Sequence, residues 1–230
     1  RPQVKDELRT KGMLMPAVQM IFRMSNRQVE TPDDYLTGKA HPTAFDGGQI
    51  DTVKMVTMAH DMTLDALPPM AMIKVVEEDE GVVGRDYFDA GPREKLFDTP
   101  CAVARIVKST KHVRRMVVSA APSQDLREKP LTYHWAVLRG DAERITIRKM
   151  DDAGSVVELL VPYHERRPIA PGSKMESNRV DIGLFAHNGA TYSPPCFVSL
   201  YYLDNEHREY DDAGRIQVVD YTHEDKKDRY

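Results

Sequence analysis

Apolar and polar residues alternate along much of the chain between residues 97 and 203. Short runs rich in β-branched and aromatic residues are separated by turns that contain Gly, Pro, Asp and Asn, and these runs are 103–107, 116–120, 131–138, 144–148, 156–161, 180–186 and 197–203. A period of two with turn signals at this spacing is typical of strands that bury one face. The pattern predicts a mainly β chain whose centre is a two-sheet sandwich.

The run from 131 to 138 shows the alternation best. Leu131, Tyr133, Trp135 and Val137 fall on one face of the predicted strand. Because they would point together into one core, we predict Leu131, Tyr133 and Trp135 as structural core residues. An exposed, sugar-stacking Trp135 is the alternative. Asn-Gly at 188–189 predicts a hairpin turn between the last two strands, since both residues tolerate a positive φ.

Residues 1–96 have a different pattern. Nine of the 12 methionines precede residue 73. Thr31, followed by a proline and two acids, predicts a helix start, residues 50–62 have the spacing of a helix of about three turns, and residues 70–76 suggest a strand. We expect an irregular, partly helical segment over 1–96 that packs on the sandwich, with methionines filling gaps in its core.

Residues 204–230 are predicted to form a β-hairpin followed by a charged tail. The segments 207–210 and 215–219 flank a turn at 211–214. Acidic and amide side chains at 204–206 and 211–212 are of the kind that Ca²⁺ prefers. Their spacing is not that of an EF-hand loop, so a solvated turn is favoured, and no cofactor is expected apart from this calcium alternative.

Composition limits the kinds of partner. Lys and Arg total 32 against 36 Asp and Glu, a net charge of −4, which argues against a sequence-independent grip on nucleic acid phosphates. No apolar run approaches the roughly 18 residues of a membrane span. The chain begins at Arg1 without a methionine, which suggests a processed chain or a piece of a longer protein.

A motif at 123–135 resembles the PKD-type immunoglobulin-like domain. In that family a Ser-x-Asp loop leads to a Leu-x-Tyr-x-Trp strand, and Ser123, Asp125, Leu131, Tyr133 and Trp135 stand in those places. The family's Gly-Asp-Gly turn has only a partial counterpart at 140–141. The resemblance spans about residues 97–203 and implies an immunoglobulin-like β-sandwich. It also implies a module that serves in spacing, adhesion or polysaccharide contact, often attached to a hydrolase.

The resemblance gives the expected function, a non-catalytic binding or spacer module of a larger extracytoplasmic protein. Secreted, periplasmic and cell-surface locations all fit, and the partner would be a protein or a carbohydrate. The alternative is a secreted hydrolase or lyase with its site between the N-terminal segment and the sandwich, using His41, His60, Asp46 and Asp86. Neither zinc-ligand spacing nor a Gly-x-Ser-x-Gly motif occurs, which favours the first reading.

Cys101 and Cys196 each follow a proline at the start of a predicted strand. The first and last strands of immunoglobulin-like sandwiches often run parallel and adjacent, so a disulfide could close a loop of about 95 residues, worth roughly 4–5 kcal/mol. Alternation places Cys196 inward with positions 198 and 200. If positions 102, 104 and 106 faced inward, Cys101 would face outward. A disulfide and two free, partly buried thiols therefore both remain open.

Overall fold

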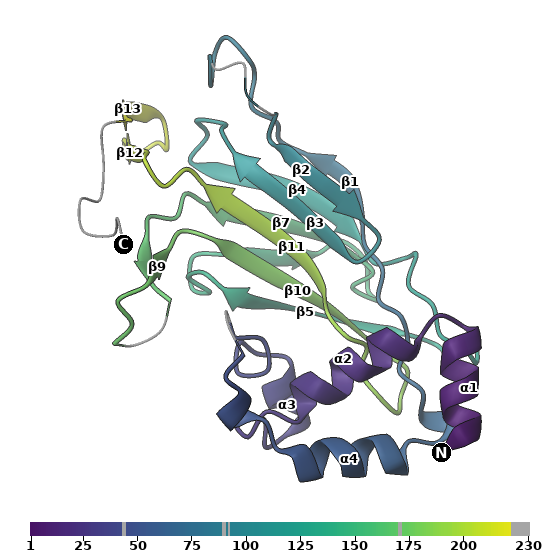
Figure 1. The fold of residues 1–230 in the computed structure, drawn as a ribbon. Helices are drawn as coiled ribbons and strands as arrows, with labels where there is room; N and C mark the ends of the chain where they lie inside the picture. The colour runs from purple at the N-terminus through teal and green to yellow at the C-terminus, as the bar shows by residue number, and fades with distance from the viewer. Residues whose placement is uncertain (43–44, 89–90, 92, 170–171, 222–230) are drawn as a thin grey trace.

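In the computed structural model, residues 1–42, 45–88, 91, 93–169 and 172–221 are described. Their arrangement places a group of short helices at one end of a β-rich body (Figure 1). The charged tail predicted near the C-terminus lies outside the described residues. The helical elements are α1 (Pro2–Thr10), α2 (Leu14–Met24), α3 (Pro32–Tyr35), η1 (Gly47–Gln49), α4 (Thr52–Asp61) and η2 (Leu64–Ala66).

The predicted helix starts agree with side-chain capping in the structure. At α3 the Thr31 hydroxyl accepts a hydrogen bond from the Asp34 N–H, and the Asp34 carboxylate accepts one from the Thr31 N–H, forming a capping box. At α4 the Asp51 carboxylate accepts the Lys54 N–H at 2.9 Å. These short local bonds satisfy N–H groups that the first turn of a helix leaves free.

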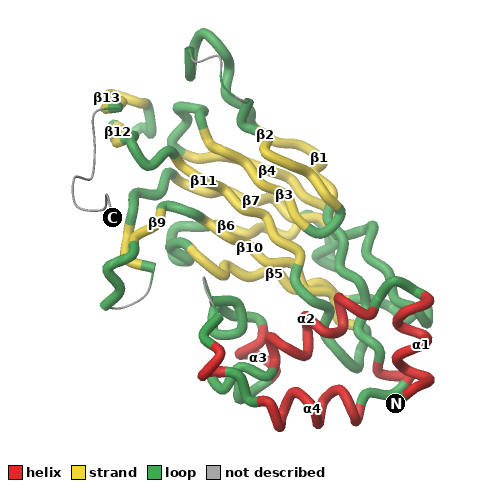
Figure 2. Tube along the Cα trace, viewed as in Figure 1, coloured by secondary structure: helices red, strands yellow, loops and turns green. Residues whose placement is uncertain are grey.

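Two sheets form the β-rich body (Figure 2). The four-stranded sheet has the order β1-β4-β7-β6, and the five-stranded sheet has the order β2-β3-β11-β10-β5. The strand pairs in both sheets are antiparallel except for β3 and β11, which run parallel. The strand bounds are β1 (Lys74–Glu78), β2 (Lys95–Thr99), β3 (Ala102–Val107), β4 (Val113–Ser119), β5 (Thr132–Arg139), β6 (Thr146–Lys149), β7 (Val156–Pro162), β10 (Val180–His187) and β11 (Cys196–Tyr202).

One hydrophobic core joins the two sheets. It contains Val118 of β4 and Leu159 of β7 from the first sheet, together with Val103 of β3, Ile182 of β10 and Leu200 of β11 from the second. Burial of these alternating residues removes apolar surface from water on both facing sheets. The prediction of a mainly β chain is confirmed.

Two small antiparallel ribbons complete the strands. β8 (Arg167–Pro168) pairs with β9 (Glu176–Ser177), and β12 (His207–Tyr210) pairs with β13 (Ile216–Asp220). The second ribbon is the hairpin that the sequence predicted after residue 204. In its turn the Asp211 carboxylate accepts the N–H groups of Ala213 and Arg215.

The helices pack on the outer face of the five-stranded sheet. Phe185 of β10 is fully buried in a second core with residues of α1 and α2, and Ala136 and Leu138 of β5 pack against this core. Met13 and Met20 are buried there, in agreement with a gap-filling role for methionine. A separate outer core explains why the strand residues of β10 are buried on both faces.

The sheets begin earlier than the composition suggested. β1 starts at residue 74 and pairs with β4, so the predicted limit at residue 97 does not coincide with the start of the sheets. The predicted strand at 70–76 is shifted, because Met70 forms only an isolated bridge with Gln124. β1 lies at the edge of its sheet and carries Glu77 and Glu78, so it lacks the apolar alternation of a central strand.

The inward face of β3 is the opposite of the one that the alternation suggested. Val103 and Val107 lie in the main core, and Arg105 between them is only 1% exposed. In the parallel register Val103 lies opposite Val198 and Arg105 lies opposite Leu200. The sequence pattern was misread because an inward arginine interrupts the apolar set.

Candidate functional site

A buried network of charged side chains lies between β1, β2, β3 and β4. The Arg105 guanidinium donates two hydrogen bonds to Glu78, at 2.7 and 2.8 Å, and one to Asp98 at 2.7 Å. Arg114 donates to Glu94 at 2.8 Å and to Glu78 at 3.1 Å. Both arginines are almost fully buried, so the carboxylates supply the compensation that buried charge requires.

Glu94 fastens the connection between β1 and β2 to the sandwich. Its carboxylate accepts the N–H groups of Gly81, Lys108 and Ser109 and the Arg114 side chain, at 2.6–2.8 Å. Burial opposes ionisation of Glu94, but the charge of Arg114 and these hydrogen bonds outweigh it and lower its pKa. The Glu94 carboxylate is therefore ionised and held in place by these hydrogen bonds.

Asp86 makes a second attachment in the same connection. Its carboxylate accepts the Val82 N–H and the Thr110 hydroxyl, each at 2.7 Å, and it pairs with Arg85 at 3.0 Å. Burial raises the pKa of Asp86, but the hydrogen bonds dominate and lower it to about 2. Together, Asp86 and Glu94 position the loop that carries the neighbouring aromatic residues.

A groove of about 460 Å³ opens beside this loop, and we call it the end groove. It is lined by Asp86, Tyr87, Phe88, Lys108, Leu203, Asn205, Glu206 and Tyr221. Phe88 is 80% exposed, which is unusual for a large apolar side chain. The Lys108 ammonium lies 4.8 Å from the centre of the Tyr87 ring. A cavity of about 220 Å³ next to the charged network shares Tyr87 with the groove.

The negative charge of Glu206 in the end groove is neutralised by Arg208. The Glu206 carboxylate accepts the Arg208 Nε–H at 2.6 Å, and Arg208 Nη1 also donates to the Ser109 carbonyl at 2.6 Å. Burial opposes the charge of Arg208, yet its contacts with Glu206 raise the Arg208 pKa. The end groove therefore offers the exposed Phe88 ring and the Asn205 amide, in a volume suited to a small ligand or one sugar of a chain.

Three of the four residues of the alternative enzyme reading have separate local roles. His60 lies exposed on α4 beside Asp61, with Nδ1 at 2.9 Å from the carboxylate. Asp46 begins η1 by accepting the Gly48 N–H at 2.8 Å. Asp86 lies in the end groove. These side chains occupy different elements and are not brought together.

His41, the fourth, is buried under the helices. Its Nδ1 lies 2.9 Å from Arg23 Nη1, and its Nε2 lies 2.7 Å from the Tyr35 carbonyl. Since arginine can only donate, Nδ1 accepts and the Nε2–H donates to the carbonyl. Burial, aided by the Arg23 charge, lowers the pKa of His41 to about 3. His41 is thus neutral at ordinary pH, and its ring nitrogens are occupied by structural bonds.

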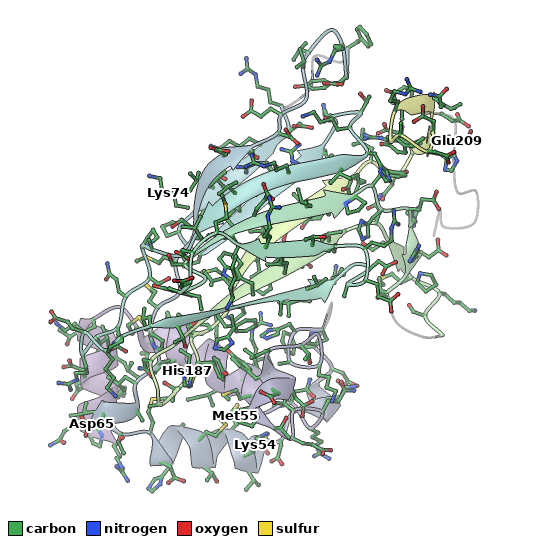
Figure 3. The ribbon with its side chains drawn as sticks, turned by 180° about the vertical axis from the view of Figure 1, so that it is seen from behind. Lys54, Met55, Asp65, Lys74, His187 and Glu209 are labelled. Carbon is green, nitrogen blue, oxygen red and sulfur yellow. The ribbon has the colours of Figure 1, made fainter. Side chains whose placement is uncertain are left out.

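A different set of rings meets where the helices join the sandwich. The Tyr192 ring lies 5.3 Å from that of His134 on β5 and 4.4 Å from that of His187 on β10. Figure 3 shows His187 at this junction. Burial lowers the pKa of both histidines. Sequence reasoning missed this junction cluster, because position 134 is on the outward side of a predicted strand and position 187 belongs to the predicted turn after the strand at 180–186.

The predicted core residues in β5 and directly before it pack against the main core but remain half-buried. Leu131, Tyr133 and Trp135 contact the core cluster from the edge. β5 ends the five-stranded sheet, so one flank of each side chain has no neighbouring strand. The Trp135 indole N–H donates to the Gly154 carbonyl at 2.9 Å.

Two of the five residues proposed for calcium have other partners. Glu206 pairs with Arg208, and Asp211 organises its own turn. Within the described ranges, no group of three or more His, Cys, Asp or Glu side chains is arranged to hold a metal ion. None of the helices in these ranges is long and apolar enough to cross a membrane.

No protein-family model matches the chain, and no curated protein matches it. Among solved structures it is similar to a nucleoside hydrolase-related hypothetical protein from Saccharophagus degradans that is associated with carbohydrate metabolism. The identity is 12%, and the match covers 65% of this chain and 29% of that one, with a TM-score of 0.31. A likeness this low carries no argument about fold or function.

Proposed function

We propose that the chain contains a PKD-type immunoglobulin-like sandwich and acts as a non-catalytic binding module of a larger extracytoplasmic protein. The observation that carries the proposal is the strand order. Immunoglobulin-like domains pack a sheet of order A-B-E-D on a sheet containing C, F and G. The orders β1-β4-β7-β6 and β5-β10-β11 correspond to these two sheets, and β3 adds a parallel strand beside β11.

Two residues of the PKD-like motif, Ser123 and Asp125, form hydrogen bonds that connect neighbouring loops. The Ser123 hydroxyl accepts the Met72 N–H at 2.9 Å. The Asp125 carboxylate accepts the N–H groups of Arg127 and Lys129, and it accepts the Asn188 side-chain amide at 2.7 Å. The motif thereby ties the loop before β5 to the turn between β10 and β11. This supports reading the motif as a structural signature of the module.

The end groove is the proposed ligand site, and a polysaccharide is the proposed ligand. The exposed Phe88 ring can cover the apolar face of a sugar, while the Asn205 side-chain amide can hydrogen-bond its hydroxyl groups. Grooves that combine ring faces with a few polar groups are typical binding sites. A site on a loop anchored by two buried carboxylates is also preorganised.

Affinity electrophoresis through gels containing a soluble β-glucan, xylan or pectin tests this proposal. Retardation of the wild type by one polysaccharide, with loss in Phe88→Ala, is expected. Phe97→Ala removes another exposed phenylalanine, which lies on β2 outside the groove, and should be retarded like the wild type. Migration of the wild type unaffected by all three polymers would contradict polysaccharide binding.

The junction cluster is the observation that favours the second candidate, a secreted hydrolase or lyase. Neutral histidines can act as general bases. His134 and His187 both contact the ring of Tyr192, at the place where the helices meet the sandwich. Release of reducing sugar ends or unsaturated products from the same polysaccharides, lost in His134→Gln and His187→Gln, would favour this enzyme over the binding module.

A further inference from the structure

The parallel pairing of β3 and β11 sets Cys101 directly opposite Cys196. Phe197 pairs with Ala102, Cys101 is the turn residue directly before β3, and the Phe197 N–H donates to the Cys101 carbonyl at 3.1 Å. Neighbouring strands lie about 4.8 Å apart. That spacing falls within the roughly 4.4–6.8 Å between the Cα atoms of disulfide-bonded cysteines.

The two side chains also point to the same face. Val103 and Val198 are register partners that both lie in the main core, and Cys101 and Cys196 precede them by two residues, with their side chains in contact. The sequence pattern suggested that Cys101 faces outward, because the charged Arg105 made positions 103, 105 and 107 of β3 look like the outward side. With Arg105 inward, the cysteines face each other without a bulge.

The environments of the two thiols differ in a way that suits disulfide chemistry. Cys101 is exposed, whereas Cys196 is 1% exposed with its sulfur 2.9 Å from the Ala71 carbonyl. A hydrogen bond between the thiols lowers the pKa of Cys101 to about 6, while the same contact and burial raise that of Cys196. Cys101 is therefore the thiolate that solvent can reach.

We propose that Cys101 and Cys196 form a reversible disulfide through attack by Cys101 on a small-molecule disulfide such as oxidised glutathione. The Cys101 thiolate bonds to one sulfur of that reagent and expels the other as a thiolate. Cys196 then loses its proton to solvent and attacks Cys101 Sγ, which expels the second small thiol. The protein gives up two protons and two electrons, and the reagent becomes two thiols.

The bond would fasten the start of the last long strand to the turn between β2 and β3. Cys196 already lies near the Pro100 carbonyl in that turn, and Ile73 N–H donates to the same carbonyl at 2.7 Å. A covalent link here would hold β3 and β11 together when the sandwich is pulled or heated. For the loop it closes, the thermal midpoint should rise by roughly 10 °C.

Wild-type protein, fully reduced and then equilibrated with oxidised and reduced glutathione, gives the first test. We expect its intact mass to fall by two hydrogen masses, a peptide map to link Cys101 to Cys196, and the thermal midpoint to rise on oxidation. A glutathione adduct that persists on Cys101, or thiols that stay unmodified in the folded protein, would overturn the proposal. This measurement does not depend on any variant or on ligand binding.

Alkylation of Cys101 by iodoacetamide across pH gives the second test. In the wild type the rate should have its midpoint at about pH 6. In Cys196→Ala it should move toward the ordinary cysteine value of about 8.5, and the glutathione adduct on Cys101 should now accumulate. The control Cys101→Ala should react with neither reagent while folded, because its remaining thiol is buried. A Cys101 midpoint near the ordinary value in the wild type would refute activation by Cys196.

Discussion

Replacing Arg105 with methionine probes the buried charged network most directly. The guanidinium makes five hydrogen bonds, of which two go to Glu78, one to Asp98 and two to carbonyl oxygens. Methionine fills similar space but supplies neither charge nor donors. The substitution leaves Glu78 with Arg114 as its remaining partner in the network.

The expected cost in free energy of unfolding is about 3 kcal/mol. Breaking a buried ion pair by removing one partner costs roughly 3–5 kcal/mol, because the other charge stays buried without compensation. The lower end applies here since Glu78 keeps Arg114, and Asp98 is 32% exposed and keeps its ion pair with Lys95. Arg215→Met is the control, because Arg215 is 79% exposed in its pair with Asp211 and should cost less than about 1 kcal/mol.

Urea denaturation followed by the fluorescence of the single tryptophan provides the assay. Adding Glu78→Gln to Arg105→Met should recover part of the lost stability, because the Glu78 carboxylate, which then has only the 3.1 Å bond to Arg114, no longer carries a charge. A loss below about 1 kcal/mol in Arg105→Met, or a double variant less stable than the single one, would show that the unpaired charge is not the cause.

Three other changes test separate features of the fold. Trp135→Ala should cost about 3 kcal/mol in a urea titration followed by circular dichroism, since a half-buried indole and its bond to Gly154 are lost; no measurable loss would contradict the packing. Gly183→Ala should destabilise by about 1–3 kcal/mol, because its new Cβ would lie 2.6 Å from Leu138 Cδ1, and a midpoint equal to the wild type's would argue against this close contact. The pKa of Asp86 is lowered from 3.8 to about 2, so its contribution is present above about pH 4 and is lost as the pH falls toward 2. Asp86→Asn should flatten the loss of stability over that window, and an unchanged acid titration would refute the assigned pKa.

The candidate sites could not be predicted from the sequence, because each is formed by residues that lie far apart along the chain. The sequence shows four consecutive acidic residues at 77–80, but the role of Glu78 depends on an arginine from another strand, since it meets Arg105 at a separation of 27 positions. The end groove was not predictable, because Phe88 and Leu203 come from two connections that only the packed sandwich brings together. The junction cluster likewise joins residues of two strands and a turn.

The sequence by itself determined the features whose cause is local. Alternation defined the strands around Tyr133 and Leu159, the Thr31 box began a helix, and Asp211 closed the hairpin, because side-chain periodicity and capping act within a few residues. Tertiary structure alone decided the inward face of β3. An arginine faces a core only when carboxylates from other strands neutralise it, and Arg105 has such partners only in the folded chain. That choice of face also sets Cys101 against Cys196.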